Sequence, residues 1–382
     1  METRKLYYED AHLRSFSARV VCCEPTENGY YVNLDATAFY PEGGGEACDL
    51  GTLGGVKVLD VQEENGIIRH LCHGPLTVGD TVTGEIDWAR RFDLMQQHTG
   101  EHIVSGLLHE KFGYMNTGFH VGGEVMEVDF DGPVSPEDLA EIERKANEAV
   151  WANIPLECWI PGKEELETVF YRTKRALPWP VRIVRVPGYD SCACCGVHVK
   201  HTGEVGLIKI LSCTALRGGV RLEMVCGGRA YRYIAKIFEE NRQVSQIFSA
   251  PMDTTAEAAR RASDALTAEK ARSTALQNRI LDEIARNYVN SGNVLHFEPN
   301  LDGGALRGLT ERIAAVCGGR AAVFSGTDGK FSYCLGQPGG DLRSLNKALC
   351  AALNGRGGGK PEYQQGSLCA TEAEIRRFFK EQ

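Results

Sequence analysis

The chain has 382 residues, of which 43% are hydrophobic and 24% charged, and its net charge at neutral pH is −9. This length allows two or three domains with their own cores, and neither a membrane span nor a signal peptide is visible in the sequence. The fourteen cysteines form no disulfide framework in so long a chain, so we expect buried or metal-bound thiols and a reducing, cytoplasmic location.

Residues 1–90 are predicted to form short antiparallel strands. Two hairpins are indicated, one between residues 19–23 and 30–34 and the other between residues 56–61 and 66–71, each around a turn that contains Asn-Gly. Strands so closely spaced are typical of a small barrel. Within this region Gly43, Gly44 and Gly45 permit a close approach of ligand and backbone, although an ordinary glycine loop fits the residues equally.

A helix is predicted over residues 94–112, interrupted only by Gly100 and Gly106. It carries His98 and His102, whose spacing of four residues places both rings on one face. Two imidazoles in this arrangement make half of a tetrahedral zinc site, but two such histidines also occur on ordinary helix surfaces.

The other half of a metal site is indicated by three cysteines and a histidine between residues 192 and 198. A turn at Gly196 lets one thiolate and His198 point into a shared cavity, and a mixed set of nitrogen and sulfur ligands suits zinc. Cys192 and Cys195 are rivals of Cys194 for the thiolate, and buried cysteines that bind no metal are the alternative.

The rest of residues 91–228 is predicted to be an α+β domain, with a strand over residues 124–130 and a helix over residues 136–151 that Ser135 caps. Near residue 172 the charge balance reverses, and Arg172, Lys174 and Arg175 lie among aromatic residues. Such a mixture can hold an RNA backbone and stack on bases, while a solvated surface loop explains it equally well.

Residues 229–290 are predicted to form a helical spacer that is broken near residues 249–251, and residues 291–382 a small α/β domain. From residue 300 onward there are 11 Lys or Arg and 8 Asp or Glu residues, so this part is locally basic. A glycine loop at residues 355–359, flanked by Arg356 and Lys360, is predicted to follow RNA or bind phosphate, and it is not a P-loop.

Four of these features resemble the editing domain of alanyl-tRNA synthetase and its free-standing relatives, the AlaX alanyl-tRNA editing proteins of the long form. They are Thr37–Glu46, His98-x-x-x-His102, Cys194-x-x-x-His198 with the following Thr202–Ile210, and the glycine run before Lys360. They follow the order of that family from residue 37 to residue 361. The chain departs from the family pattern at Cys195 and Val197, where Gly and Thr are usual, and at Glu46, where Gln is usual.

The resemblance implies an α+β multidomain protein. Its expected parts are an N-terminal antiparallel β-barrel (1–90), a zinc-containing editing domain (91–228), a helical spacer (229–290) and a C-terminal tRNA-binding-like domain (291–382). It also implies a hydrolase that removes serine, or glycine, from mischarged alanine tRNA. The implied zinc ligands are His98, His102, Cys194 and His198, with substrate near Gly43, Gly44, Gly45 and His120.

Some roles stay open at this level. Glu101 and Asp190 are candidates for orienting water or the ligands, and tRNA contacts are expected at Arg172, Lys174, Arg175, Arg356 and Lys360. A homodimer through the spacer or the last domain is compatible with the sequence. The alternatives are a non-catalytic zinc-containing tRNA-binding protein of the same fold and a general zinc esterase; a full synthetase is disfavoured because only about ninety residues precede the metal-site helix.

Overall fold

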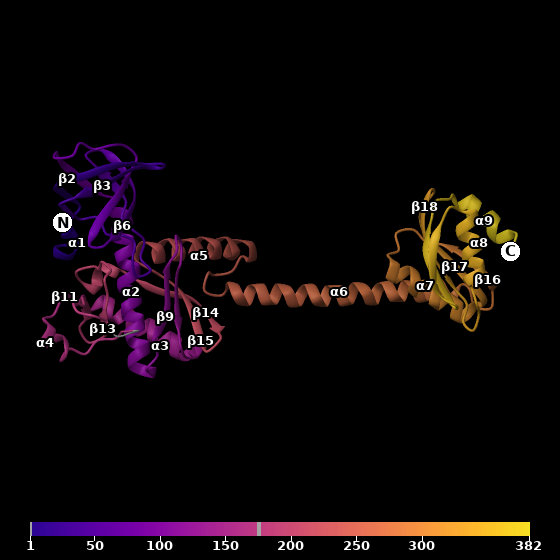
Figure 1. The fold of residues 1–382 in the computed structure, drawn as a ribbon. Helices are drawn as coiled ribbons and strands as arrows, with labels where there is room; N and C mark the ends of the chain where they lie inside the picture. The colour runs from indigo at the N-terminus through magenta and orange to yellow at the C-terminus, as the bar shows by residue number, and fades with distance from the viewer. Residues whose placement is uncertain (1, 174–176) are drawn as a thin grey trace. The chain divides into compact units, whose positions relative to one another are not determined.

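The computed structural model describes residues 2–173 and 177–382, in which the chain divides into two compact units, Met1–Arg242 and Gln243–Gln382 (Figure 1). Both units combine helices with sheets, so the predicted mixed α/β multidomain architecture is confirmed at that level. The finer division into four domains stays a prediction.

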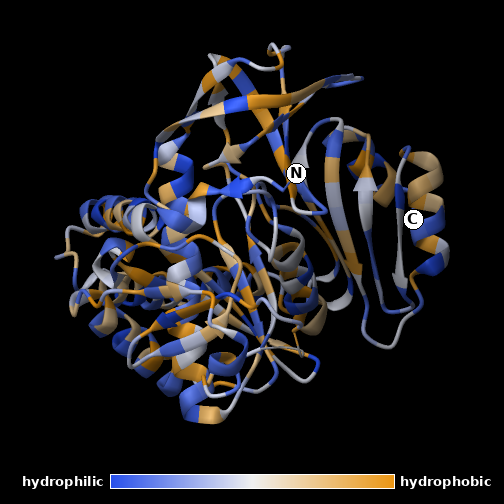
Figure 2. Ribbon diagram, turned by 60° about the vertical axis from the view of Figure 1, so that its left-hand side comes forward, coloured by the Kyte–Doolittle hydropathy of each residue, from blue (hydrophilic) through white to orange (hydrophobic). Residues whose placement is uncertain are grey.

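The first unit begins with a closed ring of antiparallel strands in the order β2-β3-β7-β6-β5-β8. Their bounds are β2 Ser15–Thr26, β3 Gly29–Leu34, β5 Gly51–Leu53, β6 Val56–Glu64, β7 Ile67–Cys72 and β8 Thr81–Ile86. Alternate residues point inward, and Val32, Leu53 and Ile68 are fully buried. Figure 2 shows the corresponding alternation of hydrophilic and hydrophobic residues along strands.

Both predicted hairpins are confirmed. β2 pairs with β3 up to Thr26 and Gly29, and β6 pairs with β7 around a two-residue turn of Asn65 and Gly66. The two turn residues have φ values of 53° and 80°, the conformation for which Asn-Gly is preferred between antiparallel strands. The short elements β1 (Arg4–Lys5), α1 (Leu6–Glu9) and β4 (Ala36–Thr37) complete this part, with β1 parallel to β4.

The long helix α2 (Trp88–Phe112) connects the barrel to the rest of the first unit. It begins earlier than predicted because the Asp87 carboxylate accepts a hydrogen bond from the Arg90 amide and caps its N-terminus. It ends at Gly113, whose φ of 75° is the left-handed conformation that glycine adopts most readily. α3 (Pro136–Trp151) is confirmed within its predicted bounds, with Ser135 as its cap.

Two sheets complete the first unit. The larger has the strand order β14-β15-β10-β9 and contributes to one core with α2 and α3; the smaller has the order β11-β12-β13. Their bounds are β9 Asn116–Val121, β10 Met126–Phe130, β14 Ile208–Leu216, β15 Gly219–Cys226, β11 Glu157–Trp159, β12 Ile183–Val186 and β13 Asp190–Ala193. The short helices α4 (Lys163–Leu166) and η1 (Thr202–Val205) lie in the connections.

The predicted helical region is confirmed as α5 (Gly227–Phe248) and α6 (Thr255–Arg286), with the expected break between them. Near its C-terminal end α6 buries Leu281 and Ala285 in a core that also contains Leu309 and Ile313 of α7 (Gly303–Cys317). The end of α6 is therefore an integral part of the second unit.

The second unit contains a five-stranded sheet in the order β16-β17-β18-β20-β19. Its strands are β16 Gly292–Phe297, β17 Gly318–Thr327, β18 Lys330–Gly336, β19 Arg356–Lys360 and β20 Tyr363–Leu368; α8 (Arg343–Ala352) and α9 (Glu372–Lys380) accompany α7. The expectation of a glycine loop at residues 355–359 was wrong, because residues 356–359 belong to the edge strand β19, which pairs with β20 along its length. Across the described residues of the chain, no helix combines the length and hydrophobicity of a membrane span.

Candidate metal centre and its cavity

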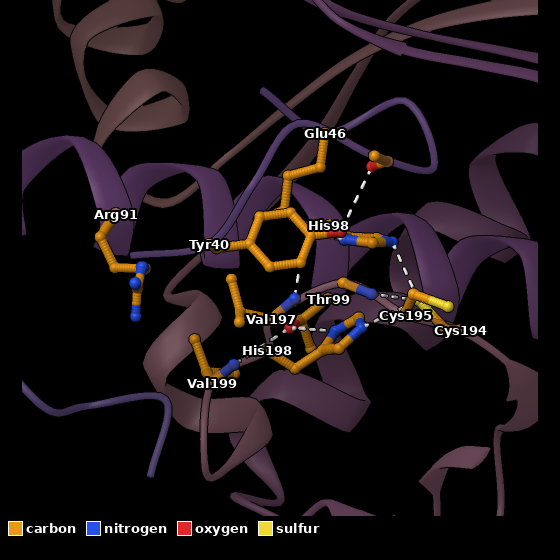
Figure 3. Close-up of polar contacts among 12 residues, drawn as sticks. Tyr40, Glu46, Arg91, His98, Thr99, Cys194, Cys195, Val197, His198 and Val199 are labelled. Atoms are coloured by element: carbon orange, nitrogen blue, oxygen red, sulfur yellow. Dashed lines mark hydrogen bonds and ion pairs between the residues drawn. The ribbon is translucent and has the colours of Figure 1, made fainter. Parts of the chain in front are cut away.

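The chain brings four metal-binding side chains together from α2 and from the turn that follows β13. His98 and His102 lie one turn apart on α2, with ring centroids separated by 5.2 Å. Cys194 and His198 come from the turn and lie beside His98 (Figure 3), and the His198 ring centroid is 4.7 Å from that of His102. One potential ligand atom of each of the four residues lies within 4.8 Å of all the others.

The spacing of these atoms fits a tetrahedral zinc ion. Cys194 Sγ lies 3.4 Å from the Nε2 atoms of both His98 and His198. Bond lengths of about 2.3 Å to sulfur and about 2.0–2.1 Å to nitrogen place two such ligands about 3.5 Å apart around one zinc ion. The donor set therefore suits this metal without rearrangement of these side chains.

Each of the three imidazoles has a hydrogen-bond partner at Nδ1, the ring nitrogen that points away from the cluster. The Nδ1 atom of His98 lies 2.8 Å from Glu46 Oε2, and that of His102 lies 3.0 Å from Asp190 Oδ2. The Nδ1 atom of His198 lies 3.1 Å from the hydroxyl oxygen of Thr99. With the proton on Nδ1, all three rings donate outward and turn Nε2 toward the centre, the arrangement that fixes the orientation of metal-ligating histidines.

Glu46 reaches His98 because the chain turns sharply before it. Gly43 and Glu46 exchange two backbone hydrogen bonds of 3.1 and 3.0 Å, and Gly45 has a φ of 90°. A Cβ atom on Gly45 would lie 2.7 Å from the carbonyl oxygen of Phe119, so only glycine fits there. The buried Glu46 carboxylate also accepts a bond of 3.3 Å from the amide of Val197, which ties the glycine turn to the ligand turn.

Asp190 is held in turn by Arg172, whose Nε and Nη2 atoms donate to its two oxygens over 2.7 and 2.9 Å. Both side chains are buried, with exposed fractions of 6% and 1%. Our expectation that Arg172 contacts tRNA is therefore replaced by a role in holding Asp190, since its guanidinium is engaged inside the protein. Lys174 and Arg175, predicted beside it, lie outside the described residues.

The ligand turn is held by two side chains, Arg182 directly before β12 and Tyr8 near the N-terminus. Arg182 Nη1 donates to the carbonyl oxygens of Cys194 and Gly196 over 2.9 and 2.8 Å, and Tyr8 of α1 donates to the carbonyl of Cys195 over 2.8 Å. The Arg182 guanidinium lies 4.7 Å from the centre of the Tyr8 ring, which joins the two side chains. The Gly196 amide donates to Cys194 Sγ over 3.3 Å.

The electrostatics of the cluster favour a thiolate. Burial by itself raises the pKa of the Cys194 thiol, but the surrounding imidazoles of His98, His102 and His198 lower it well below its ordinary value. Burial likewise opposes charge on His98, yet the Cys194 thiolate and Glu46 raise the pKa of that imidazole to about 10. The deprotonated sulfur is the form that binds metal.

A cavity of about 430 Å³ opens onto this cluster. Gly44, Glu101, Asn116, Phe119, Arg172 and Cys192 are among the residues that line it, together with three of the four clustered side chains. Phe119 of β9 stacks on the ring of His98 with centroids 5.1 Å apart. The cavity lining thus combines the apolar ring of Phe119 with the amide of Asn116 and the carboxylate of Glu101.

Of the predicted substrate-binding residues, only Gly44 lines this cavity. Gly43 and Gly45 shape the turn around it, and His120 is exposed on β9, where alternation points its side chain away from the position occupied by Phe119. Phe119, and not its neighbour His120, therefore lines the cavity. Arg356 and Lys360 lie exposed on the edge strand β19 of the second unit.

The rival thiols occupy different places. Cys195 is exposed, whereas Cys192 could join His102 and Asp190 in a second cluster. Both oxygens of Asp190 already accept hydrogen bonds from Arg172, and one of them also bonds with His102, so we favour the cluster that contains Cys194.

Sequence reasoning missed the supports of the site, which are Glu46 and Thr99 behind two imidazoles and Tyr8 and Arg182 behind the ligand turn. Among these residues, the sequence signal was clearest for Glu46, an acidic residue that directly follows three glycines.

Two protein-family models match parts of this chain that contribute to the site. Residues 181–222, which include the ligand turn, match the family model described as the Threonyl and Alanyl tRNA synthetase second additional domain. Residues 6–90 match the model for tRNA synthetases class II (A). The crystal structure of the C-Ala domain from Aquifex aeolicus alanyl-tRNA synthetase is similar over 24% of this chain and 84% of that domain, with 16% identity and a TM-score of 0.21, which is too low to establish a shared fold.

Relatives are found among two groups of curated proteins. An alanine–tRNA ligase of Pyrobaculum arsenaticum is 37% identical over 70% of this chain and 32% of the ligase, and one of Pyrococcus abyssi is 31% identical over 96% and 42%. The alanyl-tRNA editing protein Aarsd1 of Danio rerio is 30% identical over 64% of this chain and 63% of that protein. The chain spans about a third of the length of the first ligases that it matches. These matches show that the chain is homologous to the alanine–tRNA ligases and to the alanyl-tRNA editing proteins.

Proposed function

We propose that this protein edits mischarged alanine tRNA by hydrolysing the ester that joins serine, or glycine, to the terminal adenosine. The observation that carries the proposal is the cluster of three imidazoles and one thiolate, three of which line a cavity. Homology to proteins named for the ligation of alanine to tRNA and for alanyl-tRNA editing supplies the substrate class.

His98, His102, Cys194 and His198 would hold one zinc ion, because their donor atoms and spacing fit this metal. A zinc ion there supplies a Lewis acid that polarises the ester carbonyl or activates water. Glu46, Asp190 and Thr99 fix the three rings, and Arg172 keeps Asp190 in place. We assign the Gly44 backbone, at the cavity wall, to contact with the substrate.

To spare alanine, the site must recognise the serine hydroxyl. Alanine differs from serine only by lacking this oxygen, and a pocket that discriminates by size alone would still admit alanine. A site that hydrogen-bonds this hydroxyl leaves buried polar groups unpaired when alanine enters, and that mismatch rejects alanine strongly. Asn116, whose amide nitrogen donates to Glu101 Oε1 over 2.5 Å, belongs to the polar wall that can supply such a contact.

We further propose that the second unit contributes affinity for tRNA rather than chemistry. Arg356 and Lys360 are exposed on β19, where they can meet phosphates, and the unit is locally basic. We also propose a cytoplasmic location and a homodimer that forms through the helical region or the last domain.

A second function is favoured by one observation, namely that four protein ligands by themselves complete a tetrahedron. The metal would then be structural, and the protein a non-catalytic tRNA-binding module of the same fold. Zinc content and deacylation of serine-charged alanine tRNA, measured on the same preparation, separate the two. One zinc per chain with turnover supports the editing enzyme, whereas zinc and tRNA binding without turnover supports the module.

A further inference from the structure

The cavity wall contains a carboxylate that the metal cluster does not use. Glu101 lies on α2 next to His102, is only 5% exposed, and lines the same cavity as the metal-binding side chains. Its Oε1 atom accepts hydrogen bonds from the hydroxyl of Ser105 and from Nδ2 of Asn116. These two donors fix the side chain from one side.

The other oxygen of Glu101, Oε2, has no hydrogen-bond partner among residues 2–173 and 177–382, and it is not one of the buried polar atoms without a partner. It is therefore accessible from the cavity. Burying a carboxylate with one oxygen unsatisfied costs free energy unless a partner arrives with the ligand. A positively charged donor would be the strongest such partner.

Other charged groups near the metal centre do not compete for this role. Arg172 is bound to both oxygens of Asp190, which also holds His102, so this pair is mutually satisfied. Glu46 is bound to His98 and to the Val197 amide. Neither Glu46 nor Asp190 lines the cavity, whereas Glu101 lines it and has an oxygen available to a bound molecule.

We propose that Glu101 is a specificity-determining residue that binds the α-ammonium group of the aminoacyl moiety through Oε2. This inference rests on the proposed editing function and names the part of the substrate that the cavity recognises. An aminoacyl ester carries its ammonium group two bonds from the ester carbonyl carbon. A carboxylate one residue away from the ligand His102 is thus well placed to hold the ammonium while the carbonyl lies at the metal centre.

The experiment measures binding and requires no turnover. The probe is 3′-deoxy-3′-(L-seryl)amino-adenosine, in which an amide replaces the ester, and its comparison is the same molecule with an N-acetyl group, which removes the positive charge. Affinities for the zinc-loaded full chain are measured by calorimetry. We expect the free amine to bind about 10- to 100-fold more tightly, the range for a hydrogen bond to a charged group.

Glu101→Gln is the variant that isolates the charge. The glutamine Oε1 can accept the same bonds from Ser105 and Asn116, while its amide nitrogen replaces Oε2 toward the cavity. The preference for the free amine should then disappear. Glu110→Gln, an exposed residue of the same helix, is the matched control and should keep the preference.

Equal affinity of the wild type for both probes would overturn the proposal, as would an unchanged preference in Glu101→Gln. The kinetic counterpart uses seryl-tRNA and N-acetyl-seryl-tRNA. If Glu101 instead acted as a general base, Glu101→Gln would slow both substrates by the same factor and leave the binding preference intact. Discrimination between the probes without any deacylation would refute the editing function while supporting the role of Glu101.

Discussion

At the scale of single residues, the site depends on which of two adjacent cysteines faces the imidazoles. Cys194 Sγ lies 3.4 Å from two imidazole nitrogens, and Cys195 is exposed. We therefore expect Cys194→Ala to lose zinc and Cys195→Ala to keep about one zinc per chain. Elemental analysis of the two purified variants measures this. Zinc retained in the first and lost in the second would reverse the assignment.

A second prediction concerns the ion pair behind His102. Asp190 and Arg172 are both buried, so removing only the carboxylate leaves a guanidinium without its partner. We expect Asp190→Ala to lower the free energy of unfolding of the first unit by about 3–5 kcal/mol, because an unpaired buried charge is costly. Denaturant unfolding of the zinc-free protein measures this loss separately from metal binding.

The matched control for that variant is Asp129→Ala, which removes the carboxylate of the partly exposed pair with Arg221. This change should cost about 1 kcal/mol or less, since exposed pairs contribute little. A similar loss in both variants would show that burial does not govern the contribution of the Asp190 pair.

At the scale of elements, substitutions in the glycines of β19 test whether these residues form a strand and not the predicted loop. A Cβ atom on Gly357 would lie 2.2 Å from the Tyr333 hydroxyl and 2.6 Å from the carbonyl of Gln365, whereas one on Gly358 would meet no atom within 4 Å. Gly357→Ala should destabilise the sheet by about 1–3 kcal/mol and Gly358→Ala much less. Hydrogen exchange of β18 and β20 amides reports both. Equal protection in the two variants would indicate that β19 does not pack as described.

The elements that sequence patterns predicted are those with local determinants. α3 was found within its bounds because its cap, Ser135, adjoins it, and the hairpin at Asn65 and Gly66 follows from turn chemistry. The metal-binding residues of α2 were visible because their spacing along one helix is a local property. Contacts between distant segments were not visible. Glu46, 52 residues from His98, was missed as a support, and Asp190 was a candidate for orienting the ligands but its pairing with His102, 88 residues away, was not predicted.

Two glycines that seemed to weaken α2 in the sequence have a packing reason. A Cβ atom on Gly106 would lie 2.2 Å from the Tyr189 carbonyl oxygen, and one on Gly100 would lie 2.2 Å from Cys226 Sγ. They permit close approach of the helix to β15 and to the residue before Asp190. This function of the glycines depends on which segments pack on α2, and that information is not present in the helix itself.

At the scale of the whole molecule, we expect the two units to divide affinity and chemistry. The end of α6 belongs to the core of the second unit, so a chain that ends within residues 249–254 removes α6 together with that unit, whereas a chain that ends near residue 291 would keep α6 without its partner α7. A chain ending within residues 249–254 should bind zinc normally and bind tRNA more weakly, with a smaller dependence on salt concentration. Unchanged tRNA affinity, or loss of zinc, would contradict this division.

The most direct test of the account is the rate of deacylation of alanine tRNA charged with serine, compared with the same tRNA charged with alanine. The zinc-loaded protein should hydrolyse the seryl form far faster, and His102→Ala should lose both zinc and activity, since it removes one of four ligands held at this site. The Asp129→Ala variant should keep both properties. Equal rates on the two tRNAs, or full activity after zinc is shown to be absent, would contradict the proposed function.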